Sequence, residues 1–284
     1  MLFRSLHFVW SGWQYYFLTY TANIAIWRTQ PFILHYFNID HFWSLQVEEQ
    51  FYFIWPFLVF RLKRPQTLIR VSLLICLVIL FIRVFLVASH FSNIYLPYSP
   101  TFSCADNLLY GCCLCAALRT SARQRILSLA PRVFAIGVAI LFCAAILHHG
   151  LDWENNFFVP TLGFSIIGIT CAALIAMTLR PASTAQHIFE NSTMRFFGKY
   201  SYGIYVFHYS VMVISPPIRQ FVDDRFHSKV LGVIIAASAV LVATILIALL
   251  SYHFYEAPFL KLKRYFSYNR KAAAPHQSQT AAAS

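Results

Sequence analysis

Apolar residues fill long windows of this chain, and aromatic or basic residues flank each window. Such windows predict membrane-spanning α-helices, because about 20 residues at a rise of about 1.5 Å each cross a hydrocarbon core of about 30 Å. The clearest window, Val230 to Leu250, has no ionisable side chain. We expect about eight spans, at residues 7–27, 44–61, 68–90, 104–118, 132–149, 157–179, 199–217 and 230–255. The first window is rich in aromatic residues and also fits a helix lying in the membrane interface.

The composition agrees with a fold that is embedded in lipid. Of the 284 residues, 59% are hydrophobic and 11% are charged, whereas a soluble domain carries about 25% charged residues. We therefore expect an all-α, polytopic integral membrane helix bundle and exclude a water-soluble fold. No linker divides the chain, so residues 1–266 are expected to form one transmembrane domain. Residues 267–284 have no apolar period and are expected to be a disordered cytoplasmic tail.

The basic residues predict the orientation of the spans. The formal net charge is +12, but Lys and Arg occur in short clusters between the apolar windows, which indicates topology signals rather than a nucleic-acid surface. With eight spans, 17 of the 22 basic residues fall in loops on one side, so both termini are expected in the cytoplasm. Reporters fused after residue 65 or 126 should then read cytoplasmic. The first residues do not have the pattern of a cleaved signal peptide, so insertion is expected to rely on the spans.

Several kinds of site are not indicated by the sequence. The seven cysteines lie in or beside apolar windows, without paired C-x-x-C spacing, which favours small buried residues over metal ligands. The chain has no P-loop, no dinucleotide-binding glycine pattern and no G-x-S-x-G elbow. We expect neither a metal ion nor a tightly bound cofactor.

A polar cluster at the start of the second window is the strongest candidate for chemistry. At about 100° per residue, one helix face presents His41, Ser44, Glu48, Tyr52 and Trp55, with Glu49 to its side. One interpretation is a general acid/base pair of His41 and Glu48 that acts on a hydroxyl group. The other is a helix start whose carboxylates are hydrated near its positive end. The spacing alone leaves both open.

Two further polar side chains fall within apolar windows. His208 lies about 13 Å beyond Lys199 and shares a helix face with Ser201 and Tyr205, where it could line a pocket or pack through a hydrogen bond. Arg83 lies about 20 Å into its window. It could extend to the headgroups or pair with Asp106, Glu48 or Glu49, because charges within a membrane usually face an interior partner.

Four segments resemble, in order, the motifs of the acyltransferase-3 family. The run from His41 to Pro56 matches the hallmark His-x-Trp-Ser-Leu-x-Val-Glu-Glu-Gln-Phe-Tyr over a dozen positions. Residues 105–111 resemble the segment Arg-x-Asp-x-Leu-x-x-Gly, although Cys104 stands where arginine is common. Residues 198–208 and 251–258 resemble Gly-x-x-Ser-Tyr-x-x-Tyr-x-x-His and Ser-Tyr-x-x-x-Glu-x-Pro.

The resemblance implies a ten-helix domain of the bacterial inner membrane. Such a domain takes an acyl group, often acetyl, from acyl-CoA and delivers it to a hydroxyl of an envelope carbohydrate, so O-acetylation of a polysaccharide is the implied modification. Against that pattern the chain is expected to lack two N-terminal helices, the first of which carries the histidine proposed as the family's catalytic base. An isolated chain of these residues is accordingly expected to insert in the membrane with little transfer activity.

The resemblance also assigns roles to residues. It implies Glu48, His41 and Glu49 as catalytic residues, with the acceptor on the outer side and acyl-CoA on the cytoplasmic side. Glu256 could instead cap a helix and pair with the basic residues that follow it. The residues expected to bind substrate, all but Arg83 within the matched motifs, are Trp43, Ser44, Tyr52, Arg83, Asp106, Ser201, Tyr202, Tyr205, His208 and Glu256.

Two other hypotheses compete with an acyltransferase. A transporter or flippase for a lipid-linked or acylated molecule would also carry His, Arg and Glu inside the membrane, but the chain has no internal repeat of the kind that many transporters show. A non-catalytic remnant would keep the fold without turnover. Transfer of labelled acyl groups from acyl-CoA distinguishes the enzyme from both.

Overall fold

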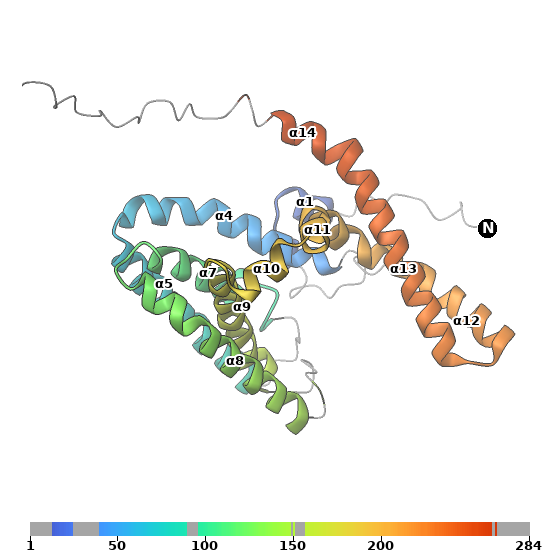
Figure 1. The fold of residues 1–284 in the computed structure, drawn as a ribbon, viewed down its shortest axis with the longest axis horizontal. Coiled ribbons are helices and arrows are strands. Elements are labelled where there is room, and N and C mark those ends of the chain that lie inside the picture. The colour runs from blue at the N-terminus through green and yellow to red at the C-terminus, as the bar shows by residue number, and fades with distance from the viewer. Residues whose placement is uncertain are drawn as a thin grey trace, which may run out of the picture. The chain divides into compact units, whose positions relative to one another are not determined.

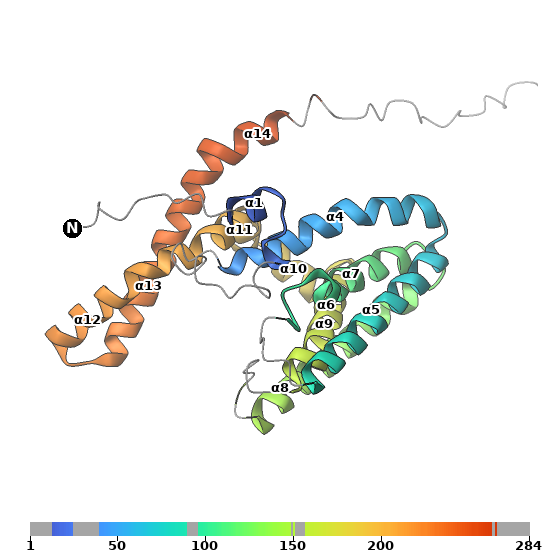
Figure 2. The same cartoon turned by 180° about the vertical axis from the view of Figure 1, so that it is seen from behind.

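The computed structural model describes residues 13–24, 40–89, 96–148, 150, 157–262 and 265. The chain divides into two compact units, Met1–Phe196 and Phe197–Ser284, which are described separately. Throughout the described residues the regular elements are helices, and no strand occurs among them (Figures 1 and 2). The expected all-α class is therefore confirmed.

The first unit contains ten helical segments within its described ranges. They are α1 (Trp13–Leu18), the 3₁₀ helix η1 (Asp40–Phe42), α4 (Trp43–Leu62), α5 (Pro65–Ala88), α6 (Thr101–Cys104), α7 (Asp106–Ala117), α8 (Arg123–Leu147), the π-helix η2 (Val159–Gly163), α9 (Phe164–Thr178) and α10 (Thr184–Glu190). The second unit takes up most of α11 (Ser192–Val211), followed by η3 (Met212–Ile214), α12 (Ser215–Phe226), α13 (Lys229–Ser251), the π-helix η4 (Tyr252–Glu256) and α14 (Ala257–Leu262).

Four helices of the first unit pack side by side. Helix α5 lies along α7, α7 contacts α9, and α9 lies along α8, as both views show (Figures 1 and 2). Close approach depends on two glycines of these helices: a Cβ on Gly168 would overlap the side chain of Asn107, and one on Gly137 would overlap that of Thr170. Small residues of this kind let helix backbones approach each other in membranes.

Helix α4 packs on this group and turns sharply into α5. Phe51 of α4 joins Cys76 and Ile79 of α5 and Leu109 of α7 in one buried apolar cluster. The turn between α4 and α5 is set by the sequence: Lys63 has φ 46°, and the proline that follows Arg64 begins α5. Proline is favoured at the first position of a helix because its fixed φ suits the helix and the missing N–H is not needed there.

Four helices are long and apolar enough to cross a membrane within the described residues. They are Pro65–Ala88, Arg123–Leu147, Val159–Thr178 and Lys229–Leu262. They correspond to the windows predicted at 68–90, 132–149, 157–179 and 230–255, so a multi-pass membrane protein is confirmed. The total of about eight spans stays a prediction.

The other predicted windows differ from the observed helices. The 44–61 window is helix α4, which is more polar than the four spans because of its glutamates and glutamines. The 104–118 window contains helix α7 of only 12 residues, or about 18 Å, preceded by a break at Ala105. Of the 7–27 window the structure describes residues 13–24, which form α1, a turn and three further helical residues at 22–24.

Two helix starts were predicted too late. Helix α8 begins at Arg123 instead of residue 132, because it continues through Pro131 rather than starting after that proline. Helix α11 begins at Ser192 instead of residue 199, because the Asn191 side chain accepts a hydrogen bond of 2.9 Å from the backbone N–H of Met194. Asparagine is among the residues that best cap a helix start. Helix α11 also ends at Val211, before the predicted limit of 217.

Small residues hold the helices of the second unit together. A Cβ on Gly203 of α11 would lie 3.1 Å from the Cβ of Ala248 on α13. Gly232 of α13 faces the backbone of Arg219 on α12 at a similar distance, 3.2 Å. Nearby, Lys199 lies 4.7 Å from the Tyr252 ring. These contacts place the residues 198–208 and 251–258 motifs beside each other within the second unit.

Candidate functional site

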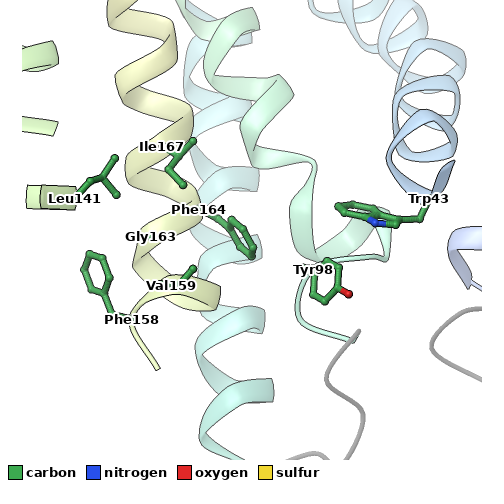
Figure 3. Close-up of a pocket in the computed structure, with 8 residues that line it drawn as sticks. All are labelled: Trp43, Tyr98, Leu141, Phe158, Val159, Gly163, Phe164 and Ile167. Atoms are coloured by element: carbon green, nitrogen blue, oxygen red, sulfur yellow. The ribbon is translucent and has the colours of Figure 1, made fainter. Parts of the chain in front are cut away.

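An apolar cavity of about 400 Å³, which we call the aromatic cavity, opens in the first unit between α4, α8, η2 and α9 (Figure 3). Trp43, at the start of α4, and Tyr98 form one wall, and their rings meet edge to face with centroids 5.2 Å apart. The lining residues are Trp43, Tyr98, Leu141, Phe158, Val159, Gly163, Phe164 and Ile167. The volume lies within the range of about 300–1,000 Å³ that is usual for small-molecule sites.

The opposite wall is built by the start of the α9 segment. In η2 the backbone runs through π-helical turns before α9 begins, and the Thr161 hydroxyl donates a hydrogen bond of 2.6 Å to the carbonyl of Phe157. Figure 3 shows Phe158, Val159 and Phe164 arranged along this wall, with Leu141 of α8 beyond them. π-Helical turns are frequent at functional sites because they change which side chains face a cavity.

A buried ionic cluster joins α5, α7 and α9 next to this wall. The Arg83 guanidinium donates to both carboxylate oxygens of Asp106, with N···O distances of 2.7 Å each, and to the carbonyl of Ser103 at 3.0 Å. Ser165 donates from Oγ to Asp106 at 2.8 Å and accepts a hydrogen bond from Arg83. Arg83 and Asp106 are 0% exposed, so the bidentate pair is fully removed from solvent.

This cluster answers one of the questions that the sequence left open. Arg83 pairs with Asp106, and it neither extends to the headgroups nor pairs with Glu48 or Glu49. The Arg83 side chain lies 5.9 Å from the ring of Phe164, which lines the cavity. The two charged residues therefore lie next to a lining residue and do not line the cavity themselves. That Arg83 and Asp106 contact a substrate directly stays a prediction.

A second buried network is neutral and connects α4 to the segments that precede α4 and α7. The Gln50 amide donates to the Asn23 side chain at 2.9 Å, and the Asn23 amide donates to Thr101 Oγ1 at 3.2 Å. Thr101 in turn donates to the Gln50 carbonyl oxygen. Gln46 accepts a hydrogen bond of 2.7 Å from the backbone of Asn23. This network holds the first turns of α4 in place, and Trp43 with them.

The predicted catalytic residues lie at the same end of α4. His41 is half-buried in η1, with its ring edge-on to Phe42 at 4.6 Å, and its carbonyl accepts a hydrogen bond of 3.5 Å from Ser44. Glu48 is half-buried and Glu49 is exposed. Within the described residues neither glutamate has a hydrogen bond or an ion pair, and their catalytic role stays a prediction.

Two other residues of the predicted α4 face lie further along the helix. Tyr52 is 55% exposed. Trp55 stacks on Phe51 with centroids 5.2 Å apart. Neither residue lines the aromatic cavity.

The predicted residues of the second unit lie on α11 and η4. Tyr202 is exposed, and Ser201 is exposed and donates a hydrogen bond of 3.0 Å to the carbonyl of Gly198. The imidazole Nδ1 of His208 lies 2.6 Å from the carbonyl of Tyr205, and the two rings are 5.7 Å apart. Glu256 is half-buried in η4 and forms no ion pair with any described basic residue.

Sequence reasoning missed several residues that the structure brings into these networks. Ser165 looked like any small residue of an apolar window, and only its place across from Asp106 gives it a role. Gln46 and Gln50 were part of the hallmark run but were not singled out. The helix period gave no signal for them, because at about 100° per residue Gln46 and Gln50 share a face with the exposed Phe53 and Phe57.

Comparison with known proteins gives the same assignment as the motifs. The family model described as an acyltransferase domain matches residues 5–253. A Bacillus subtilis protein, YrhL, provisionally named a peptidoglycan O-acetyltransferase, is 30% identical over 243 residues, which are 82% of this chain and 36% of YrhL. The peptidoglycan O-acetyltransferase OatA of Listeria monocytogenes is 30% identical over 238 residues, covering 78% and 35%.

The match to a third relative has the same extent. OatA of Staphylococcus aureus, named an O-acetyltransferase, is 28% identical over 244 residues, covering 80% of this chain and 38% of the relative. The chain thus spans a little over a third of the length of these relatives. No solved structure matches the chain significantly. The match over most of its residues shows that this membrane protein belongs to the acyltransferase-3 family.

Proposed function

We propose that the chain carries the membrane domain of an O-acyltransferase, which moves an acetyl group from acyl-CoA to a hydroxyl of a cell-wall carbohydrate. The observation that carries the proposal is the aromatic cavity at the start of α4, where Trp43 of the hallmark motif forms part of the wall. The named activities of the relatives support the carbohydrate acceptor and the acetyl group. Acyl-CoA as the donor follows from the family resemblance.

The cavity suits the acceptor. Trp43, Tyr98, Phe158 and Phe164 offer flat apolar faces, against which the C–H face of a sugar ring can pack while its hydroxyls remain free. Because the lining is nearly all carbon, the polar groups that direct a reactive hydroxyl come from the cavity edge. The nearest candidates in sequence are His41 and Ser44, which flank Trp43.

Glu48 and His41 supply the acid/base chemistry. A hydroxyl oxygen attacks the thioester carbonyl, the carbon–sulfur bond breaks, and the thiolate of CoA leaves. The hydroxyl proton passes to a base, for which His41 and Glu48 are the candidates on the face that leads to the cavity. Glu49 is exposed and has a supporting role. Positioned general bases contribute about 10²–10⁴-fold in rate.

The proposal also includes the membrane in which the chain lies and its orientation there. The chain lies in a bacterial inner membrane with both termini in the cytoplasm, as the distribution of basic residues favours. The α4–α5 and α7–α8 turns then face the cytoplasm, where acyl-CoA is available. A reporter near Glu154 that reads cytoplasmic would contradict this orientation.

The test measures the transfer of labelled acetyl groups from acetyl-CoA to a cell-wall carbohydrate. The assay uses membranes from cells that express the protein. Trp43→Ala should reduce transfer at limiting acceptor about tenfold or more, because it removes one wall of the cavity. Phe53→Ala is the matched control: Phe53 is 74% exposed on the same helix, and its loss should leave transfer near normal. Glu48→Gln should abolish transfer with normal accumulation, and Glu49→Gln should be milder. Full transfer by the Trp43 and Glu48 variants would refute the site.

A further inference from the structure

A second cavity, of about 260 Å³, lies at the other end of α4 and differs from the aromatic cavity in its charge. It is lined by the end of α4, the start of α5 and the end of α7. Its lining includes the basic residues Lys63 and Arg119 and the apolar residues Trp55 and Leu68. Two cations from separate turns thus border one cavity that also has an apolar surface.

The segments that form this cavity supply no carboxylate to neutralise these cations. From Phe51 to Ala105 and from Asn107 to Leu151 the sequence has no Asp or Glu. The carboxylate between them, Asp106, is fully engaged by Arg83 inside the bundle. Within these segments Lys63 and Arg119 therefore have no acidic neighbour, and an external anion is the natural counterion.

The shape of the cavity restricts the anion further. Trp55 is held against Phe51 by stacking, and Val59 and Ala116 add apolar surface beside the cations. A small inorganic ion would leave this side uncovered. An amphiphile with a phosphate group and an apolar stem would cover both, since phosphate is bound by Lys and Arg and the stem by the indole and leucine side chains.

We propose that the cavity between α4, α5 and α7 binds a phosphate-bearing amphiphile, with the phosphate at Lys63 and Arg119 and the apolar stem against Trp55. Two sources share this chemistry, the headgroup of an anionic phospholipid and the phosphates of a CoA thioester. The site is separate from the aromatic cavity and does not depend on the proposed function. Its position at the turns of the bundle fits the membrane surface, where either source is found.

Tryptophan fluorescence can report occupancy directly. The full chain in phosphatidylcholine nanodiscs is titrated with phosphatidylglycerol brominated on its acyl chains, which quenches indole fluorescence at contact. We expect saturable quenching at low phosphatidylglycerol content that is lost in the Trp55→Phe protein. Brominated phosphatidylcholine should quench only in proportion to its amount. Equal quenching by both lipids would overturn the proposal.

A pair of double variants tests the cations. Lys63→Gln/Arg119→Gln should weaken binding about 30-fold. Arg123→Gln/Arg125→Gln removes the same charge from the adjoining turn without touching the cavity lining, and its effect should be several times smaller. Equal losses in the two would mean a diffuse basic surface and would overturn the site. Should the first variant not accumulate, the comparison of the two lipids in the unaltered protein decides.

Coenzyme A identifies the source. If coenzyme A added to the aqueous phase relieves the quenching, the phosphates of coenzyme A occupy the cavity. If it does not, the occupant is the lipid headgroup. Both results support the site. The readout is binding without turnover, so a failure here leaves the proposed transfer untouched, and failure of the Trp43 and Glu48 tests leaves this site untouched.

Discussion

The two units of the chain hold their helices together by different means. Eleven polar or charged side chains are buried within the described residues, and all but Thr244 belong to the first unit. There, hydrogen bonds and an ion pair cross between helices. In the second unit, glycine and alanine let α11, α12 and α13 approach closely. A shifted helix leaves buried polar groups unpaired in the first unit, and it loses the close contacts at Gly203 and Gly232 in the second.

This difference indicates that the helix arrangement is more tightly specified in the first unit than in the second. The first unit contains the hallmark motif, the aromatic cavity and both hydrogen-bond networks, so the proposed site is held by directional bonds. In the second unit Ser201 and Tyr202 of the family motif are exposed. Directional bonds define one arrangement more sharply than close packing does, as the cost of an unpaired buried group is about 1–3 kcal/mol or more.

The largest expected effect comes from breaking the ion pair. Asp106→Asn leaves the Arg83 charge buried without a counterion and should lower stability by about 3–5 kcal/mol. The measurement is thermal unfolding in detergent together with the amount of protein in the membrane. An unchanged melting temperature would mean that the pair does not hold α5 to α7.

The double variant Arg83→Met/Asp106→Leu separates charge from packing. Replacing a buried pair by apolar residues of similar size is often neutral or stabilising, so this protein should recover most of the lost stability. If it folds but no longer transfers acetyl, the pair contributes to the reaction beyond holding the helices. A double variant as unstable as Asp106→Asn would contradict the pairing.

A medium effect is expected from overpacking the second unit. Gly203→Val places new methyl groups against Ala248 and should cost about 1–3 kcal/mol. Hydrogen exchange should increase in peptides of α11 and α13 but not in those of α5 and α7. Gly198→Val is the control, because nothing lies within 4 Å of its Cβ position. Increased exchange of α5 and α7 would contradict the separation into two units.

A smaller loss is expected from Ser165→Ala. The change removes one hydrogen bond to Asp106 and one from Arg83, while the ion pair remains. Stability should fall by about 1–2 kcal/mol. Ser128→Ala removes an exposed hydroxyl that bonds only to its own helix, and its melting temperature should stay the same.

The smallest effect should have the opposite sign. The buried Thr244 hydroxyl has no hydrogen-bond partner in the described part of the chain, so Thr244→Val should leave stability unchanged or raise it by up to about 1 kcal/mol. Thr170→Val in the first unit loses a bond of 2.7 Å to the Ile166 carbonyl and should be destabilising. A lower melting temperature for the Thr244 variant would show that its hydroxyl is satisfied in the membrane.

The sequence predicted the helices that depend only on the composition of their own segment. The apolar windows at 68–90 and 157–179 became α5 and the η2–α9 segment, because burial in lipid depends on composition over some 20 residues. Two of its errors concern helix starts: the apolar window at 132–149 missed the part of α8 before Pro131, and the cap at Asn191 was not considered.

The candidate site was less predictable, because its contacts join distant segments. Pairing of Arg83 with Asp106 was one of several options that sequence spacing could not separate, and Ser165, 82 residues from Arg83, carried no signal at all. The aromatic cavity depends on Trp43 and Phe158 lying on facing segments. Such placement is decided by how helices pack, which a periodic pattern along one helix does not specify.

The buried ion pair also has a consequence for how the protein is made. Arg83 is synthesised 23 residues before Asp106, so a ribosome that adds about 5–20 residues per second leaves the arginine without its partner for roughly 1–5 s. During that interval, release of α5 alone into lipid would cost about 2.5–3.5 kcal/mol. Helix α5 is therefore expected to remain beside the translocon until α7 emerges, so that the two helices enter the lipid with Arg83 and Asp106 already paired.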